Sequence, residues 1–206
     1  MYKTYLFNTG ISNLLSVDHA LKKLNYDVVK IDNFIDIEEG CLVVVPGVGH
    51  FDNIMNKLST SNFKKTDLLI KEKKIFFLGI CLGMQILFEN SEEGTSKGLG
   101  YFEGSVRKLS NRFNGGKHIS TNVGWKNVQI KNSTLDKFNN NQFYFVHQYE
   151  AIPRNERDIF ATTTLFDQSV AVGVKKDNVC GIQFHPEKSG TVGLEFLDFL
   201  IKDFCG

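Results

Sequence analysis

Hydrophobic positions in the first half of the chain alternate between two spacings. Leu14, Val17, Leu21 and Leu24 recur every three or four positions, which predicts an amphipathic helix over residues 14–24. Further helices are predicted over residues 51–58, 63–73 and 82–88, and short apolar runs predict strands over residues 3–7, 27–31, 41–45 and 75–80. The runs CLVVV and IFFLGI are continuous, as in strands buried on both faces. Strands that alternate with helices predict a parallel sheet with helices on both of its faces.

The second half shows short strands that follow one another with turn residues between them. Strands are predicted over residues 106–109, 126–130, 143–146, 159–164, 170–174 and 179–184, and an amphipathic helix over residues 192–204. Consecutive strands without helices between them indicate an antiparallel or mixed extension of the sheet. Since there is no internal repeat and no linker, residues 1–206 are predicted to form a single α/β domain, in which a mostly parallel central sheet is flanked by helices and continued by this extension.

Composition and charge narrow the classes of function. Hydrophobic residues make up 42% of the 206 residues, enough for one sizeable core, and the formal net charge is +1. No basic run is dense enough to follow a phosphate backbone, so a nucleic-acid binder is not expected. No apolar run reaches the roughly 18 residues of a membrane helix, and residues 1–7 lack the pattern of a signal peptide. We therefore expect a soluble cytoplasmic protein with no membrane partner.

The four cysteines have neither C-x-x-C spacing nor the spacing of a zinc site with histidine. No metal is expected, and in a reducing cytoplasm each cysteine is expected to be a free thiol. Cys41 and Cys180 lie in apolar strand-like runs, which indicates core positions, and no chemical role is expected for Cys205.

The segment Gly79-Ile80-Cys81-Leu82-Gly83 carries the strongest chemical signal. It lies where a predicted buried strand meets a predicted helix, and its G-x-nucleophile-x-G pattern is that of a nucleophile elbow. The glycines permit a sharp turn in which a Cβ atom would collide with the neighbouring strand and helix. Cys81 would lie at the helix N-terminus, where the dipole favours a thiolate, and the N–H of Leu82 would face a developing oxyanion. The alternative is an ordinary tight turn that happens to contain a cysteine.

A cysteine nucleophile needs a base, and His185 is the best candidate among the five histidines. It follows the predicted strand over residues 179–184, at the edge where a parallel sheet presents its catalytic residues. Glu187 could bend back to the far imidazole nitrogen and fix its tautomer. His147 ends another predicted strand and is a competitor, and His118 lies in a stretch that indicates a loop. The alternative is a strand-end histidine followed by a surface glutamate.

A second glycine element, Pro46-Gly47-Val48-Gly49, also follows a predicted buried strand. It lacks the full G-x-G-x-x-G spacing of a dinucleotide site and the Lys-Ser/Thr of a P-loop. One interpretation is a mobile backbone segment that supplies an N–H to an oxyanion hole. The other is an ordinary turn between a strand and a helix.

Several segments of the chain resemble a known family. GICLGMQ at residues 79–85 and FHPEKSG at residues 184–190 are similar to motifs of the class I (triad) glutamine amidotransferases. Within that family the chain resembles the glutaminase subunits of imidazole glycerol phosphate synthases, through NLLSVDHAL, PGVGHF, GLGYFEGSV, VGW and YFVHQY. The resemblance implies a flavodoxin-like three-layer fold that hydrolyses L-glutamine without a metal or organic cofactor. It also implies a heterodimer with a (β/α)8-barrel cyclase, which uses the channelled ammonia to make imidazole glycerol phosphate and AICAR in histidine biosynthesis.

The resemblance further implies roles for individual residues. Cys81, His185 and Glu187 match the catalytic triad, and Leu82, Val48 and Gly49 match the segments whose backbone forms the oxyanion hole. The glutamine-binding positions are matched by Gln85, Glu93, His147, Gln148 and Tyr149, and the positions that face the cyclase by Trp125, Tyr144 and Lys188.

Two departures from the family pattern bear on the partner. Where the family begins Asp-x-Gly-x-Gly-Asn, residues 8–13 read NTGISN, with Asn8 and Ser12 replacing Asp and Gly. Where the family has Pro-His-Met before Gly-Trp, residues 121–123 read TNV, near the expected partner surface. One alternative is therefore a paralogous glutaminase that supplies ammonia to a sugar amidotransferase in surface glycan biosynthesis. A cysteine hydrolase of the dienelactone type and a non-enzymatic scaffold are the other two, and the complete Cys-His-Glu set argues against the scaffold.

Overall fold

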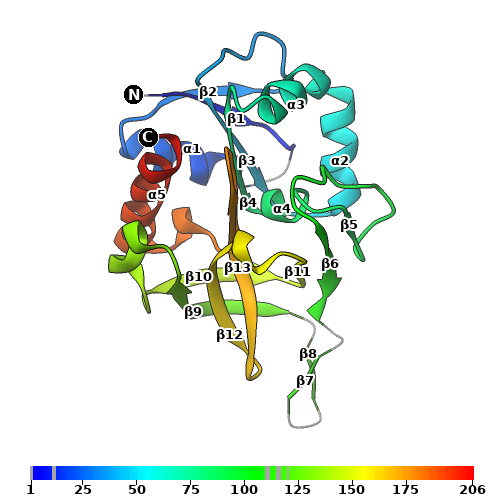
Figure 1. The fold of residues 1–206 in the computed structure, drawn as a ribbon, viewed down its shortest axis with the longest axis vertical. Coiled ribbons are helices and arrows are strands. Elements are labelled where there is room, and N and C mark those ends of the chain that lie inside the picture. Colours follow the sequence, from blue (N-terminus) through cyan, green and yellow to red (C-terminus); the bar gives the residue numbers. More distant parts are fainter. Residues whose placement is uncertain (1, 11–12, 110–111, 115–116, 120) are drawn as a thin grey trace.

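A long mixed sheet forms the centre of the protein, and helices cover it on both sides (Figure 1). The computed structural model describes residues 2–10, 13–109, 112–114, 117–119 and 121–206, and for residues 112–114 and 117–119 the backbone alone. The elements of the first half are β1 (Lys3–Phe7), α1 (Leu14–Lys23), β2 (Asp27–Ile31), β3 (Leu42–Gly47), α2 (Phe51–Thr60), α3 (Phe63–Lys71), β4 (Phe76–Cys81) and α4 (Leu82–Gln85).

The elements of the second half are mostly strands, as predicted. They are β5 (Asn90–Ser91), β6 (Gly104–Lys108), β7 (Arg112–Asn114), β8 (Lys117–Ile119), β9 (Asn122–Ile130), β10 (Gln142–His147), β11 (Tyr149–Pro153), β12 (Ile159–Leu165), β13 (Gln168–Lys176) and β14 (Val179–Ile182). Helix α5 (Gly190–Cys205) and the short 3-10 helices η2 (Ser133–Phe138), η3 (Glu156–Asp158) and η4 (Pro186–Lys188) complete the described elements.

The first half builds the parallel part of the sheet, in the order β2-β1-β3-β4, and β14 from the second half joins it beside β4. Every neighbouring pair in this part is parallel. Beyond β14 the strands β13, β12, β9 and β10 continue the sheet with antiparallel pairing. The predicted division into a parallel core and an antiparallel extension is therefore confirmed.

One face of the parallel strands packs against α1 and α5. Because side chains alternate between the two faces of a strand, every second residue of β3 points to this layer. Leu42 and Val44 share a buried cluster with Val17 and Leu21 of α1 and Leu197 of α5.

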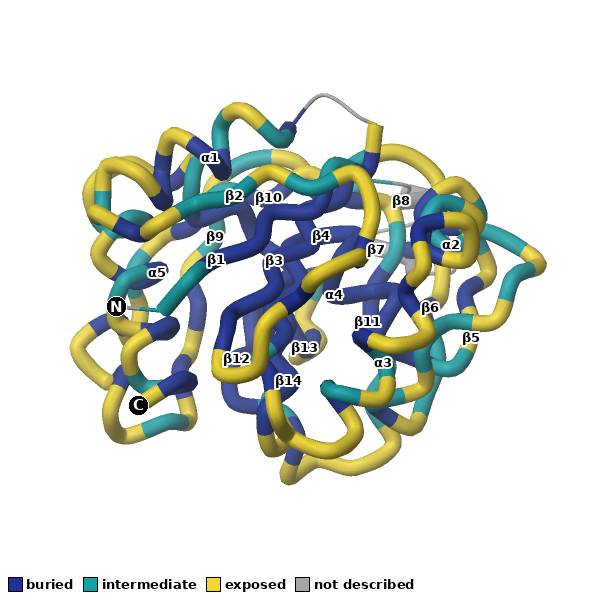
Figure 2. The backbone as a smooth tube through the Cα atoms, turned by 90° about the horizontal axis from the view of Figure 1, so that it is seen from above, coloured by how far each residue is buried: buried dark blue, intermediate teal, exposed yellow. Residues whose placement is uncertain are grey.

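The opposite face packs against α2 and α3. Val43 and Val45 of β3 share a second buried cluster with Phe51 and Ile54 of α2 and Ile70 of α3. The tube view shows the buried strands enclosed between exposed outer segments (Figure 2). The fold is thus the three-layer arrangement of helices, sheet and helices that the resemblance implied.

The helix predicted over residues 82–88 is wrong in length, because α4 ends at Gln85. The carbonyls of Ile86 and Leu87 accept hydrogen bonds from the N–H groups of Leu99 and Phe102 instead of continuing the helix. These two donors lie more than ten residues further along the chain, so the local sequence does not reveal them. The apolar run Ile86-Leu87-Phe88 is buried, but in a turn rather than in a helix.

Two features of the second half were not predicted. Strand β11 pairs with β6 and β13, and β7 pairs with β8 as a hairpin, so the backbone of His118 lies in a strand and not in a loop. The side chain of His118 lies outside the described residues, as do Ile11 and Ser12 of the first departure from the family pattern. Within the described part of the chain, no helix combines the length and apolarity needed to cross a bilayer.

Candidate active site

Strand β4 ends at Cys81 and α4 begins at the next residue, as the elbow motif predicts. Cys81 has φ 58° and ψ −110°, a conformation that non-glycine residues rarely adopt and that costs strain. A Cβ atom on Gly79 would lie 2.1 Å from the carbonyl oxygen of Gly83, and one on Gly83 would lie 1.9 Å from that of Val45. Both glycines are therefore required for the close approach of β3, β4 and α4 that presents the thiol.

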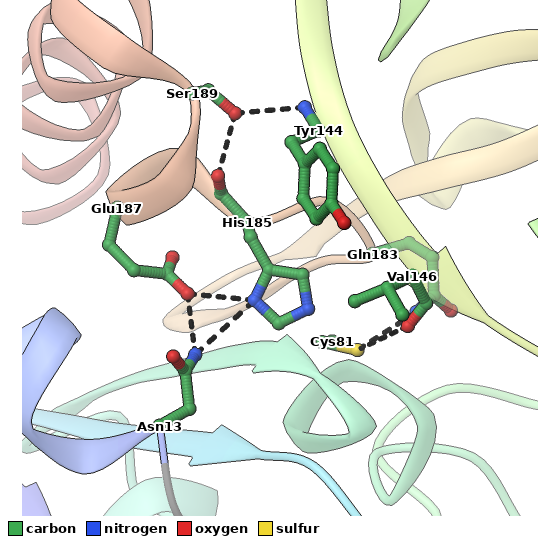
Figure 3. A network of polar contacts seen from close by, with 8 residues as sticks. All are labelled: Asn13, Cys81, Tyr144, Val146, Gln183, His185, Glu187 and Ser189. Carbon is green, nitrogen blue, oxygen red and sulfur yellow. Dashed lines mark hydrogen bonds and ion pairs between the residues drawn. The ribbon is translucent and has the colours of Figure 1, made fainter. Parts of the chain in front are cut away.

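His185 and Glu187 meet in a buried ion pair close to this thiol. Strand β14 delivers the chain to His185, and η4 begins at the following proline. The Nδ1 atom of His185 lies 2.7 Å from the Oε1 atom of Glu187, and both side chains are 0% exposed. Figure 3 shows the imidazole between the Glu187 carboxylate and the Cys81 sulfur, with its other nitrogen, Nε2, free of protein partners among the described residues.

The environment of His185 favours its charged form. Burial lowers the pKa of its imidazole, but the charge of the nearby Cys81 sulfur and the contact with Glu187 outweigh burial and raise the pKa to about 10. A protonated imidazole, paired with Glu187 and close to the Cys81 sulfur, is therefore the expected form of His185 at neutral pH. Since α4 is a single turn, its dipole at Cys81 is weaker than that of the longer helix predicted over residues 82–88 would be.

The backbone of His185 is locked to the neighbouring strand β10. Its N–H donates to the carbonyl of Tyr144 at 2.9 Å. The hydroxyl of Ser189 donates to the carbonyl of His185 at 2.6 Å and accepts the N–H of Tyr144 at 2.9 Å. These bonds fix the imidazole relative to β10, which also borders the site.

A cavity of about 350 Å³ opens above the thiol. Its walls include Cys81, Thr121 and Val146. They also include every residue expected to bind glutamine or to form the oxyanion hole, which are Val48, Gly49, Leu82, Gln85, Glu93, His147, Gln148 and Tyr149. This size suits a small molecule such as an amino acid, and the buried sulfur lies in the cavity wall. His185 and Glu187 lie behind the sulfur and do not line the cavity.

Glu93 places a carboxylate on the cavity wall. It accepts the N–H of Phe51 at 2.8 Å, and burial raises the pKa of its carboxyl although that hydrogen bond lowers it. The neighbouring loop is held by Asp52 of α2, which accepts the N–H groups of Thr95 at 3.0 Å and Ser96 at 2.8 Å. The N-terminus of α2 thus ties this loop to the segment that carries Val48 and Gly49.

The contacts of His147 differ from those of His185. Its Nδ1 lies 2.7 Å from the carbonyl of Tyr149 and its Nε2 lies 2.9 Å from the amide nitrogen of Asn122. Nδ1 must therefore donate and Nε2 must accept, which describes a neutral imidazole. Burial lowers the pKa of His147 to about 4. With both nitrogens engaged, His147 has none left to activate Cys81.

Two residues of the site were not singled out by the sequence. Asn13 donates to Oε1 of Glu187 at 2.5 Å and also approaches Nδ1 of His185 at 3.3 Å. Gln183 donates to Sγ of Cys81 at 3.5 Å and accepts from Gln85 at 3.0 Å. Gln183 precedes His185 by two positions, and this closeness in the sequence is the one signal that could have drawn attention to it.

Two of the residues expected to face a partner, Trp125 and Tyr144, lie on β9 and β10. Tyr144 pairs with Trp125 across these strands, and their rings stack edge to face with centroids 6.0 Å apart. Trp125 is 49% exposed, and the neighbouring Val123 and Val146 are exposed as well. Lys188 on η4 is exposed. The described residues contain no cluster of three or more His, Cys, Asp or Glu side chains that could hold a metal ion.

The three-layer fold with a cysteine elbow and a buried His-Glu pair defines an amidotransferase of the triad type. A family model described as glutamine amidotransferase class-I matches residues 5–202. The chain therefore belongs to the class I glutamine amidotransferase family, whose enzymes typically carry a Cys-His-Glu triad.

Comparison with individual proteins gives a finer likeness. The chain is 38% identical to the imidazole glycerol phosphate synthase subunit HisH of Prochlorococcus marinus subsp. pastoris, over 98% of each chain. It is 35% identical to the subunit of the same name from Staphylococcus aureus, over 91% of each chain. Its fold is similar to a crystal structure of a glutamine amidotransferase (TM-score 0.69, 19% identity, 98% of each chain) and to PurLQS from Thermotoga maritima (TM-score 0.67, 16% identity, 98% of this chain and 99% of that one).

Proposed function

We propose that this chain is the glutaminase subunit of an imidazole glycerol phosphate synthase, acting as one domain over residues 1–206. In this proposal Cys81, His185 and Glu187 are the catalytic triad that releases ammonia from L-glutamine. The observation that carries it is the convergence of these three side chains, from β4 and from the segment after β14, beneath a cavity sized for an amino acid. The named relatives support the pathway assignment.

The first chemical step is attack by the Cys81 thiolate on the side-chain amide carbon of glutamine. A carbon–sulfur bond forms, and the carbonyl oxygen takes the negative charge. The N–H of Leu82 and an N–H of the Val48-Gly49 segment lie along the cavity wall and would donate to this oxygen. Each such donor is typically worth a factor of about 10² to 10³ in rate. Gly49, at φ 106°, allows this segment a backbone conformation that other residues would resist.

The second step expels ammonia. The protonated His185 gives its Nε2 proton to the departing nitrogen, and the carbon–nitrogen bond breaks to leave a thioester on Cys81. His185, now neutral, takes a proton from a water molecule, and the hydroxide attacks the thioester. Glutamate leaves, and the thiolate and the imidazolium are restored. Glu187 holds Nδ1 throughout, so that Nε2 always faces the sulfur and the substrate.

The remaining residues of the cavity would bind the ends of glutamine. Glu93 offers a negative charge to the α-ammonium, and the backbone at His147, Gln148 and Tyr149 offers polar groups to the α-carboxylate. Gln85 also lines the cavity, and its amide nitrogen donates to the carbonyl of Tyr149 and to Gln183. This arrangement would select a free amino acid, which has both an α-ammonium and an α-carboxylate group, over a glutamine residue within a peptide.

The product ammonia would pass to a (β/α)8-barrel cyclase that docks on the face formed by Trp125, Tyr144 and Lys188. Bulk water would protonate ammonia and remove its nucleophilicity, so the two active sites would share a closed passage. In the cytoplasm, the cyclase would use the ammonia to make imidazole glycerol phosphate and AICAR. No cofactor enters any step of the glutaminase reaction.

The test is glutamate release from L-glutamine by the chain alone and with a cyclase subunit. We expect turnover to rise with the cyclase and Cys81→Ala to abolish it. Substantial turnover by Cys81→Ala would overturn the triad assignment. A chain that hydrolyses simple esters and leaves glutamine intact would instead be a cysteine hydrolase.

A second candidate partner rests on the segment 121–123. Thr121 lines the cavity and Asn122 donates to His147, where the family commonly has Pro-His. A paralogous glutaminase that serves a sugar amidotransferase in surface glycan biosynthesis would tolerate such a change at the partner side of the site. Stimulation of glutamine hydrolysis by a sugar-modifying enzyme, and not by the cyclase, would favour this candidate.

A further inference from the structure

Two side chains of the segment that follows β14 approach the sulfur of Cys81 from different sides. Strand β14 ends at Ile182, so Gln183 is the first residue after the strand and His185 comes two positions later. Figure 3 shows the His185 imidazole on one side of Sγ and the Gln183 amide on the other. The triad mechanism uses the first of these groups and gives the second no role.

The orientation of the Gln183 amide is fixed by a chain of hydrogen bonds. Nε2 of Gln85 donates to the carbonyl of Tyr149 at 3.1 Å and to Oε1 of Gln183 at 3.0 Å. Since Nε2 of Gln85 is a donor in both contacts, the Gln183 atom facing it must be the oxygen. The nitrogen of Gln183 is thereby directed at Sγ, 3.5 Å away.

The amide is buried as deeply as the core. Gln183 is 1% exposed, so it cannot exchange its hydrogen bonds for solvent, and a buried donor without a partner is costly. The carbonyl of Val146, 3.9 Å from Sγ, can only accept and so favours the protonated thiol. Gln183 has the opposite effect, because its amide nitrogen donates to the sulfur and so favours the thiolate.

We propose that Gln183 is a further catalytic residue, whose Nε2 donates to the Cys81 sulfur and holds the thiolate in line for attack. This inference rests on the proposed role of Cys81 as nucleophile. The Gln183 amide carries its protons at every stage of the cycle, so it can donate to the thiolate before the attack and again when glutamate leaves. Through Gln85 it also joins the sulfur to the wall of the substrate cavity.

The test is the pH dependence of Cys81 alkylation by iodoacetamide, which reacts with the thiolate. Burial raises the pKa of Cys41, Cys180 and Cys205 to about 12, so these thiols react slowly and the readout belongs to Cys81. The titratable groups around Sγ among the described residues are His185 with Glu187 behind it, His147 on β10, and Glu93 and Tyr149 on the cavity wall. All of them are retained in the variants below.

Gln183→Met keeps the bulk of the side chain and removes the donor. We expect the midpoint of alkylation to rise by about one pH unit, the rate at pH 7 to fall about tenfold, and kcat with the cyclase to fall about tenfold while KM changes less than about twofold. Gln183→Glu, of the same shape, places a carboxylate at Sγ and should raise the midpoint further. Gln129→Met makes the same exchange at an exposed position on β9 and should leave alkylation unchanged.

A folded Gln183→Met or Gln183→Glu protein with the midpoint of the unmodified chain would overturn the inference, and circular dichroism establishes folding. If Gln183→Met does not fold, the isosteric Gln183→Glu decides alone. Cys81→Ser separates this inference from the proposed function. Glutamine hydrolysis or unchanged fast labelling in Cys81→Ser would refute the nucleophile itself, whereas a normal pH profile in the Gln183 variants refutes only the role of Gln183.

Discussion

The Oε1 atom of Glu187 lies 2.7 Å from Nδ1 of His185, and neither side chain has any exposure to solvent. A buried carboxylate at this distance stabilises the imidazolium and keeps the second nitrogen turned to the sulfur. The side-chain amide of Asn13 also donates to Oε1 of Glu187 and so helps to hold the carboxylate in place.

Glu187→Gln should leave the fold intact and reduce activity strongly. The amide keeps the shape but not the charge, so the imidazolium and with it the thiolate lose their support. We expect kcat/KM to fall by roughly 10²- to 10⁴-fold, the range seen when general acid–base groups lose their partners. Steady-state glutaminase assays with the cyclase measure this, and a decrease below about threefold would contradict the role of Glu187. Glu195→Gln, the same acid–amide exchange at an exposed position on α5, is the matched control.

Asp52→Ala should weaken glutamine binding from a distance. Asp52 holds the N–H groups of Thr95 and Ser96, and hydrogen bonds from this loop lower the pKa of its carboxyl. Without them the loop that carries Glu93 would lose its fixed position. We expect KM for glutamine to rise several-fold, with a smaller change in kcat. Asn53→Ala, at the next and more exposed position of α2, should leave KM unchanged, and equal effects in both variants would refute the argument.

His147 should make the fold sensitive to mild acid. Its pKa is about 4 when folded, below the ordinary value of 6.5, so the unfolded chain binds the proton more readily. The stability linked to His147 is therefore complete above pH 6.5 and is lost as pH falls through 4, by about 3 kcal/mol in total. Urea unfolding measures the unfolding free energy at pH 7 and at pH 4.5. Between these pH values the unfolding free energy should fall less for His147→Gln than for the unmodified chain. An equal fall in the two proteins would contradict the lowered pKa of His147.

Gly83→Ala should disrupt the elbow. The added methyl group would lie 1.9 Å from the carbonyl oxygen of Val45, and neither backbone can move without displacing β3 or α4. We expect a loss of roughly 1–3 kcal/mol in unfolding free energy, together with loss of glutaminase turnover. Gly40→Ala is the control, because a methyl group there meets nothing within 4 Å and costs only the strain of its φ of 73°. Chemical unfolding compares the two.

Trp125→Ala should weaken binding of the cyclase. A large exposed aromatic ring supported by Tyr144 is typical of a side chain that dominates an interface. We expect the Kd to rise about tenfold or more by calorimetry, with no change in the Tm of the chain alone. Phe199→Ala removes another exposed aromatic ring, on α5, and should leave the Kd unchanged. An unaltered Kd in Trp125→Ala would place the partner elsewhere.

The local part of the site could be predicted from the sequence, and the long-range part could not. The elbow around Cys81 is encoded by five adjacent residues, and His185 follows a strand of clear apolar pattern. The predicted length of the helix after Cys81 was wrong because the carbonyls of Ile86 and Leu87 accept hydrogen bonds from Leu99 and Phe102, which lie well beyond this segment in the sequence. The contact between Asn13 and Glu187 joins segments from opposite halves of the chain, and no spacing in the sequence reports it.

The position of β14 has a consequence for synthesis. The strand lies inside the sheet, between β4 and β13, although most of the chain is translated before it. A ribosome-bound chain that has emerged only through β13 therefore holds Cys81 without His185, and one edge of β4 is unpaired. Such an intermediate lacks the triad, and its unpaired strand edge is open to pairing with other chains until β14 emerges, so the yield of folded protein should depend on how quickly β14 follows.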